Sequence, residues 1–165
     1  MSDHRAFNPG DVACFVLTVS DTRTSATDTS GRAIVSALGD AGHAVTGHRI
    51  VRDEPDEVIG AIRQELREGH ARVIITTGGT GISRRDSTYE ALSTMFEKQL
   101  DGFGEIFRML SFQEIGPPAM LSRAAAGVAS GRAMFLLPGS EAAVRLAMTR
   151  LILPELGHIV KELTK

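Results

Sequence analysis

Short β-branched runs and amphipathic segments alternate along the first half of the chain. Residues 13–20, 43–51 and 72–77 are apolar runs rich in Val, Ile and Thr, a composition typical of strands buried on both faces. Between these runs, apolar side chains recur at the three- and four-residue spacing of a helix, over residues 34–41 and 58–66. The order β-α-β-α-β with short connections predicts right-handed crossovers and a largely parallel sheet covered by helices.

Polar and glycine residues mark the ends of these helices. Asp28-Thr29-Ser30 offers several N-cap side chains for the first helix, and Gly42 ends it. Asp56 is the expected N-cap of the second helix, which closes at Gly69. The pattern thus indicates where each helix starts and stops.

The second half of the chain continues the alternation less regularly. Residues 88–96 predict a helix, residues 133–137 a strand, and residues 143–152 lie in a closing helix. Between them, Phe103, Ile106, Phe107 and Leu110 form an apolar stripe that stops before Pro117-Pro118. Such a stripe is normally core, and the alternative is a subunit interface.

Three polar turns follow three of the predicted strands. They are Ser20-Asp21, the segment Thr77 to Gly81 and Pro138-Gly139-Ser140. In an open α/β sheet, ligands bind beyond the carboxyl ends of the strands. One topology would therefore gather all three turns at a single crevice.

The glycine-rich turn after residues 73–77 is the most informative of the three. Gly78, Gly79 and Gly81 allow the backbone to approach a ligand closely, and successive N–H groups in such a turn suit phosphate oxygens. The turn is neither a Walker A loop nor a GxGxxG fingerprint, which removes the commonest kinase, GTPase and dehydrogenase interpretations. A sharp structural corner without a ligand remains the alternative.

Charged residues close to the turns suggest a phosphate and metal site. Asp53 ends the second strand and Asp86 follows the glycine turn, and carboxylates near a polyphosphate usually serve Mg²⁺. The alternatives are that Asp86 caps the next helix and that Asp53 is solvent-exposed beside Glu54. Of Arg84 and Arg85, we expect one to contact phosphate.

Composition narrows the class of protein. The chain has 165 residues, 42% hydrophobic and 23% charged, which fits one domain over residues 12–165 after a flexible polar leader, residues 1–11. The formal net charge of −2 argues against a nucleic-acid partner, and no apolar run is long enough for a membrane span. A cytoplasmic protein is expected.

Cysteine and histidine offer little covalent chemistry. Cys14 is the single cysteine and lies in a predicted buried strand, so we expect a packing role. The five histidines show no spacing typical of metal ligands or of a general base and are expected on the surface or in strands. The candidate chemistry is therefore electrostatic and metal-assisted.

Six segments follow one another over about residues 12–160: TVSDTRTS, DTSG, ITTGGTGISRRD, DGFGEIFRMLSFQEIG, LSRAAAGV and LLPGS. In this order they resemble the motifs of the MogA/MoaB family of molybdenum cofactor biosynthesis, whose fold the gephyrin G domain shares. The fourth motif looks MoaB-like, whereas SRRD and the residues around Asp53 look closer to active MogA. Glu141 stands where the family usually has a proline.

The resemblance implies a fold and an activity. The fold is a three-layer α/β/α sandwich with a mostly parallel central sheet, assembled as a homo-oligomer, a trimer or hexamer. The activity is Mg²⁺-dependent adenylylation of molybdopterin: its phosphate attacks the α-phosphate of ATP and releases pyrophosphate. The implied partners are molybdopterin, ATP and other proteins of the cofactor pathway.

The family's catalytic aspartates correspond to Asp53 and Asp86, which are also the implied metal ligands. The binding turns of the family correspond to four segments of this chain, and the sequence pattern adds Thr76 and Arg85 beside them. The expected substrate-binding residues are Ser20, Asp21, Thr76, Thr77, Gly78, Gly79, Thr80, Gly81, Arg85, Ser122, Arg123, Pro138, Gly139 and Ser140.

Two other functions stay open. The first is a non-catalytic molybdopterin-binding oligomer, a carrier or regulator, since some MoaB-type members lack the first aspartate and are thought inactive. This chain keeps that aspartate, which favours the enzyme. The second is an unrelated nucleotide-dependent enzyme on the same fold.

Overall fold

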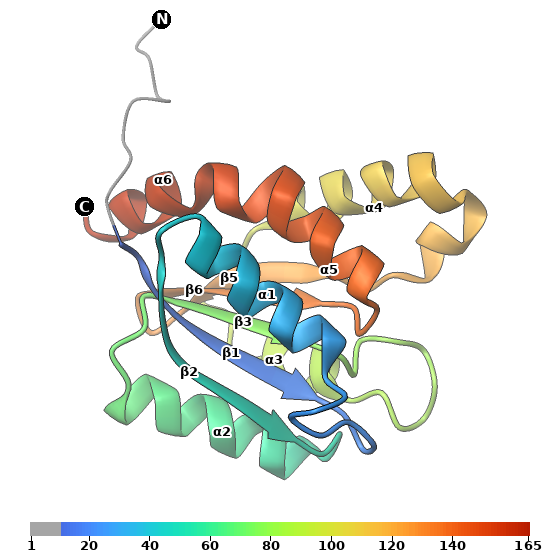
Figure 1. The fold of residues 1–165 in the computed structure, drawn as a ribbon, viewed down its shortest axis with the longest axis horizontal. Coiled ribbons are helices and arrows are strands. Elements are labelled where there is room, and N and C mark those ends of the chain that lie inside the picture. Colours follow the sequence, from blue (N-terminus) through green and yellow to red (C-terminus); the bar gives the residue numbers. More distant parts are fainter. Residues whose placement is uncertain (1–10) are drawn as a thin grey trace, which may run out of the picture.

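The computed structural model describes residues 11–165, which form a six-stranded sheet with the strand order β2-β1-β3-β6-β5-β4 (Figure 1). The strands are β1 (Ala13–Val19), β2 (Ala44–Val51), β3 (Val73–Thr77), β4 (Lys98–Gln99), β5 (Ala125–Ala129) and β6 (Arg132–Leu137). The expected leader, residues 1–11, lies outside the described residues except for Asp11.

Helices cover both faces of the sheet, as Figure 1 shows. On one side lie α1 (Thr29–Asp40), α4 (Asp101–Ile115), α5 (Glu141–Ala147) and α6 (Leu153–Leu163). On the other side lie α2 (Pro55–Glu68) and α3 (Thr88–Ser93). The three-layer architecture is therefore confirmed.

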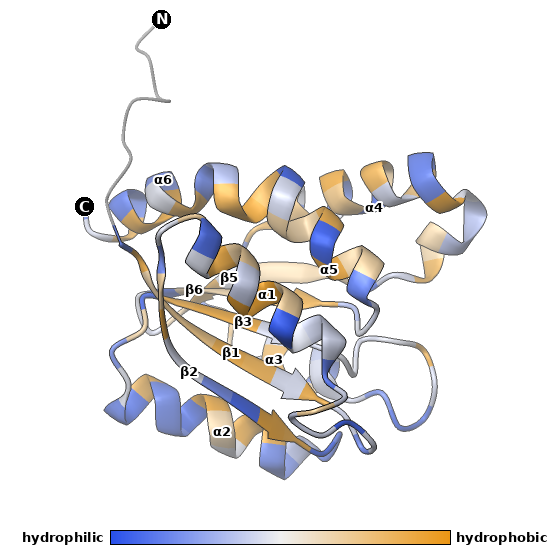
Figure 2. Cartoon of the chain, in the orientation of Figure 1, coloured by the Kyte–Doolittle hydropathy of each residue, from blue (hydrophilic) through white to orange (hydrophobic). Residues whose placement is uncertain are grey.

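The continuous apolar run of β1 reflects burial on both faces. Cys14 and Val16 pack into the core beneath α1, whereas Phe15 and Leu17 pack into the core above α2. Figure 2 shows the same division, with apolar central strands and a polar outer face on α2. Cys14 is fully buried, and burial raises the pKa of its thiol to about 12, which fits the expected packing role.

The sheet is parallel over β2, β1, β3 and β6, as the first half of the sequence predicts. The far edge differs, because β5 pairs antiparallel with β6 and β4 with β5. The sequence did not predict β5, since its Ala and Gly composition has low strand propensity. The sequence signal for this hairpin was the dipeptide Ser130-Gly131 just before β6. In the structure these two residues have φ of 50° and 70°, the positive values of a tight hairpin turn.

Helix boundaries confirm most of the expected stops. Glu54 is the N-cap of α2 and Pro55 opens the helix, so the expectation that Asp56 caps it is wrong. The closing helix is broken into α5, a π-helical turn η2 (Met148–Ile152) and α6. Pro117 begins a short 3-10 helix, η1 (Pro117–Leu121), after α4. Among the described helices, none combines the length and apolar character that crossing a bilayer requires.

A buried polar cluster ties α1 to the sheet. Asp28 is fully buried as the N-cap of α1 and accepts a hydrogen bond from the Gly31 N–H, 2.9 Å. Its Oδ2 accepts a second bond from the Thr18 hydroxyl, 2.6 Å, and lies 3.0 Å from His48 Nε2. The spacing of histidines in the sequence did not indicate a structural role for His48, because its partners come from β1 and from the loop before α1.

We predict that Asp28→Ala lowers the free energy of unfolding by about 2–4 kcal/mol, because it removes a helix cap and leaves buried polar groups without a partner. Urea denaturation measures this change. The matched control is Ser140→Ala at the solvent-exposed N-cap of α5, for which about 1 kcal/mol is expected. Equal losses in the two variants would contradict a structural role for the buried cluster.

Candidate functional site

The carboxyl ends of β1, β3 and β6 open onto one cavity of about 260 Å³. Its lining combines the three polar turns with the end of β2, as the sequence predicts. The lining residues are Thr18, Val19, Ser20, Asp21, Arg23, Ser30, Asp53, Thr77, Gly78, Gly79, Arg85, Asp86 and Gly139. We call this cavity the crevice.

Gly78 brings the three turns into backbone contact. A Cβ at this position would lie 2.1 Å from the Val19 carbonyl oxygen, which is too close for any side chain. On the other side, a Cβ at Gly139 would lie 3.4 Å from the Gly78 Cα. Its φ of +97° also disfavours any side chain. The Gly78 N–H donates to the Leu137 carbonyl, 3.0 Å, and the Thr77 hydroxyl to the Pro138 carbonyl, 2.8 Å. The glycine is therefore required by the corner itself, whatever the turn binds.

The next part of the turn carries evidence of a different kind. Within residues 11–165, the N–H groups of Gly79, Thr80, Gly81 and Ile82 donate no hydrogen bond, whereas the Gly79 carbonyl accepts one from the Thr88 N–H, 2.9 Å. Successive backbone N–H groups of this kind can bind an oxyanion, and we call these four donors the N–H cradle. The Thr88 hydroxyl beside Gly79 is fully buried and has no hydrogen-bond partner among the described residues.

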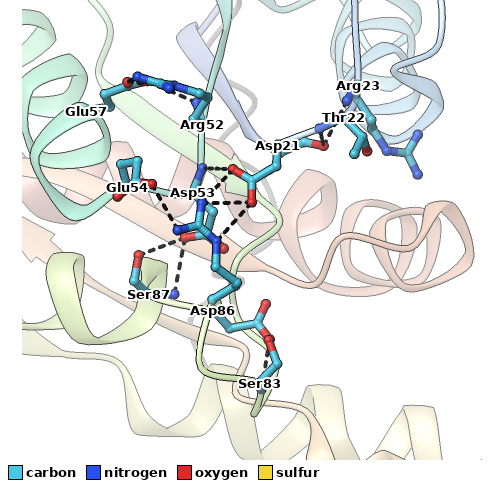
Figure 3. A network of polar contacts seen from close by, with 12 residues as sticks. Asp21, Thr22, Arg23, Arg52, Asp53, Glu54, Glu57, Ser83, Asp86 and Ser87 are labelled. Atoms are coloured by element: carbon cyan, nitrogen blue, oxygen red, sulfur yellow. Dashed lines mark hydrogen bonds and ion pairs between the residues drawn. The ribbon is translucent and has the colours of Figure 1, made fainter.

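Asp53 lies close to Gly79 and Asp86 close to Gly81. Figure 3 shows that a serine contacts each of the two carboxylates, Ser87 and Ser83 respectively. Asp53 Oδ1 accepts hydrogen bonds from the Ser87 N–H, 3.2 Å, and hydroxyl, 2.7 Å. Asp86 Oδ2 accepts from the N–H and hydroxyl of Ser83, 2.9 and 2.6 Å. Asp53 is only 8% exposed and the N-cap of α3 is Ser87, so neither the exposed position for Asp53 nor the capping role for Asp86 describes these side chains.

The two aspartates suit a magnesium ion. Asp53 Oδ2 and Asp86 Oδ1 have no hydrogen-bond donor among the described residues, and both side chains line the crevice. Mg²⁺ takes one or two carboxylates and completes its shell with waters and phosphate oxygens. Residues 11–165 contain no group of three or more His, Cys, Asp or Glu ligands placed for a metal, so an all-protein metal cage does not fit.

Arg85 lines the crevice and bridges two acids. Its guanidinium binds Asp21 through two nitrogens, with a shortest distance of 2.9 Å, and Glu54 at 2.9 Å. The hydrogen bonds that Asp21 accepts from Arg85 lower its pKa, and a further bond from the Asp53 N–H, 3.0 Å, acts in the same direction. Of the two adjacent arginines, Arg85 is the one that lines the crevice, and an incoming phosphate would have to compete with its acidic partners.

The remaining expected residues divide into two groups. Ser20 lines the crevice, and its hydroxyl accepts hydrogen bonds from the N–H groups of Thr22 and Arg23, 3.2 and 3.0 Å. The others do not line it: Thr76, Thr80, Gly81, Pro138 and Ser140, of which Thr76 is buried within β3 and Ser140 caps α5.

Ser122 and Arg123 line a second cavity of about 290 Å³, between α3, α4 and β5. It shares no lining residue with the crevice. Ser122 and Arg123 therefore line a different cavity from the three polar turns, although the Arg123 guanidinium also donates to the Thr80 and Gly81 carbonyls.

The sequence analysis did not identify Thr18, Arg23 and Ser30, which also line the crevice. The Ser30 hydroxyl donates to the Gly139 carbonyl, 2.6 Å, across 109 positions of the chain. Its place in the first turn of a helix that follows a strand was the available signal. Its partner could be known only from the sheet order.

Comparisons with known proteins show which family this chain is similar to. The family of the probable molybdopterin binding domain matches residues 15–158. Molybdenum cofactor biosynthesis protein B of Halalkalibacterium halodurans is 49% identical, covering 100% of this chain and 98% of that protein. The corresponding protein of Bacillus subtilis is 47% identical with the same coverage.

Solved structures show the same similarity. A crystal structure of a molybdenum cofactor biosynthesis protein B has a TM-score of 0.92 and 48% identity, covering 96% of this chain and 99% of that one. The tungsten cofactor synthesizing protein MoaB from Pyrococcus furiosus has a TM-score of 0.86 and 37% identity, covering 96% of this chain and 100% of that one.

We predict that Arg85→Gln raises the pKa of Asp21 toward its ordinary value of 3.8, as measured by NMR titration of the carboxyl carbon. A folded-state pKa below the unfolded value stabilises the protein above pH 3.8, and this contribution is lost as the pH falls through the folded pKa. The stability difference between wild type and variant should therefore shrink at acid pH.

Arg52→Gln is the control for this titration, because Arg52 pairs mainly with Glu57 and does not line the crevice. It should raise the pKa of Glu57, which Arg52 lowers, and move that of Asp21 far less. An Asp21 pKa that is the same in Arg85→Gln as in wild type would show that the pair does not form in solution.

Proposed function

Because the chain belongs to the MogA/MoaB family of molybdenum cofactor biosynthesis proteins, we propose that it binds molybdopterin and adenylylates it with ATP. One observation carries the proposal. Within the described part of the chain, the backbone N–H groups of Gly79 to Ile82 have no partner, and the two nearby carboxylates each keep an oxygen free of hydrogen bonds. An anion cradle next to a magnesium-type donor pair is what a phosphate-to-phosphate reaction requires.

The reaction forms one bond and breaks one. An oxygen of the pterin's phosphate attacks the α-phosphorus of ATP, and the bond from that phosphorus to the bridging oxygen breaks, so that pyrophosphate leaves. The chain supplies position and charge stabilisation and no covalent intermediate. The N–H groups of the glycine turn hold the pterin's phosphate. Of the residues that carry them, Gly79 lines the crevice together with Ser20 and Thr77.

Asp53 and Asp86 would hold Mg²⁺, which neutralises charge on the triphosphate when it is bound. Ser87 and Ser83 fix the two carboxylates by donating to one oxygen of each, which leaves the other oxygen available. Arg85 balances the acidic rim formed by Asp21 and Glu54. Both aspartates are therefore assigned to turnover and the turn to binding.

A protein that binds molybdopterin without catalysis is the competing function. It would use the same N–H cradle but would not need the free oxygens of Asp53 and Asp86. The two functions consequently differ in what the carboxylates contribute, and substitution of one carboxylate separates them.

We predict that purified protein, given molybdopterin, ATP and Mg²⁺, forms adenylyl-molybdopterin and pyrophosphate, both measured by chromatography. Asp86→Asn should keep molybdopterin binding within about threefold but lower turnover by at least about 100-fold, because the amide cannot serve the metal as a carboxylate does. Asp56→Asn is the control, because Asp56 is exposed on α2 and lines neither cavity.

The outcomes separate the candidate functions. Tight molybdopterin binding without any product would reject the enzyme and leave the carrier. Equal turnover in wild type and Asp86→Asn would remove Asp86 from the reaction. Absence of molybdopterin binding would reject both functions.

We also propose that the chain forms a homo-oligomer through α4 and η1. Large apolar side chains stay exposed at every third position of the second half of α4 and continue onto η1: Ile106, Met109, Phe112, Ile115, Met120 and Leu121. On the same helix Phe107 and Leu110 are buried, so the predicted stripe is core on one side, while Ile106 is 45% exposed. Apolar patches of this kind usually mark an interface.

Phe112→Glu should shift the mass measured by light scattering toward the monomer, since it places a charge where an apolar contact is expected. Gln113→Glu adds the same charge at the neighbouring exposed position and should leave the mass unchanged. A wild-type protein that is monomeric would reject the proposal.

A further inference from the structure

Arg123 reaches from the start of β5 to the backbone of the glycine turn. Its Nε donates to the Thr80 carbonyl, 3.0 Å, and its Nη2 to the Gly81 carbonyl. The same guanidinium forms an ion pair with Glu90 and lies 5.1 Å from the centre of the Tyr89 ring. Arg123, which precedes β5, and its α3 partners thus hold one side of the turn.

These two hydrogen bonds determine the direction of two N–H groups. All peptide bonds in residues 11–165 are trans, so each carbonyl points opposite to the N–H of the same peptide unit. Because the Thr80 and Gly81 carbonyls face Arg123, the N–H groups of Gly81 and Ile82 point away from it. Both belong to the unpartnered donors of the proposed phosphate cradle.

The turn needs such an external support. Gly78 and Gly79 adopt φ of +97° and +69°, and glycine has more backbone freedom than any other residue. Four donors without partners make no bonds that would fix their own orientation. Ordering one residue's backbone costs free energy, which ligand binding would otherwise have to supply.

Arg123 has little hydrogen-bonding capacity left for a ligand. A guanidinium has five N–H donors, and four bonds from Arg123 go to the two carbonyls and to both carboxylate oxygens of Glu90. The ion pair also lowers the pKa of Glu90, so positive and negative charge are balanced beside the turn. This occupancy argues against direct recognition of an anion by Arg123.

We infer that Arg123 is a positioning residue, which acts through the Thr80 and Gly81 carbonyls to hold the N–H groups of Gly81 and Ile82 ready for a phosphate. Glu90 supports it by fixing the guanidinium. The inference rests on the proposed function, because it assumes that the glycine turn binds a phosphate. It replaces the expectation that Arg123 itself contacts the substrate.

The chain contains a matched control at the opposite end of the sheet. Arg132, at the start of β6, donates in the same way to three backbone carbonyls, those of Glu65, Leu66 and Gly69. Its side chain is 18% exposed, compared with 26% for Arg123. Arg132→Lys thus has a similar structural cost without touching the turn.

The experiment titrates the ¹⁵N-labelled full chain with inorganic phosphate and follows the N–H signals of residues 79–82. In wild type, phosphate should shift these signals. Arg123→Lys keeps the charge but loses the two-pronged contact, and we expect about tenfold weaker binding, the equivalent of ordering one residue's backbone. Arg132→Lys should bind phosphate as wild type does, even where its melting temperature falls.

Glu90→Gln provides an independent test, because two explanations predict opposite changes in phosphate affinity. Removing a negative charge near an anion should strengthen binding if only electrostatics act, whereas loss of support for Arg123 should weaken it, by about threefold. This variant also serves if Arg123→Lys fails to fold.

Each outcome has one meaning. No shift of residues 79–82 in wild type would reject the phosphate cradle and with it the proposed function. Shifts in wild type with unchanged affinity in Arg123→Lys, tighter binding in Glu90→Gln, or equal weakening in Arg132→Lys would overturn the positioning role alone.

Discussion

The close packing of backbone at Gly78 is the constraint on which the crevice depends. The end of β1, the turn after β3 and the turn after β6 meet there with no room for a side chain. Parallel pairing of these three strands brings their carboxyl ends to one edge. The hydrogen bonds from Gly78 to Leu137 and from Ser30 to Gly139 then hold the turns in register.

Charge at the crevice is arranged around backbone donors instead of a cationic pocket. Arg85 is neutralised by Asp21 and Glu54, and Arg123 by Glu90. The attractive groups without an acidic partner among the described residues are therefore the N–H donors of the turn and Arg23, whose guanidinium donates to the Thr27 carbonyl and the Thr29 hydroxyl. Such an arrangement favours a ligand that brings its own counter-ion, as a magnesium-bound nucleotide does. It also agrees with the small net charge of the chain, −2.

The family is well supported and the activity is a separate matter. Identity of 49% over the whole chain and a TM-score of 0.92 establish the MogA/MoaB family and its fold. Fold and family do not by themselves specify a reaction, which depends on particular side chains. In the function proposed above, the side chains that separate an adenylyltransferase from a binding protein are Asp53 and Asp86.

The sequence by itself determined the alternation of elements, the parallel pairing of its first half and the convergence of three turns, because hydrophobic period and glycine chemistry are local properties. It could not determine β5, whose small residues carry no strand signal, or the Asp28–Thr18–His48 cluster, whose members are distant in sequence. It also grouped Arg123 with the substrate-binding turns. Only the tertiary structure showed Arg123 bonded to the carbonyls of the glycine turn, because hydrogen-bond direction depends on how β5 and α3 pack beside that turn.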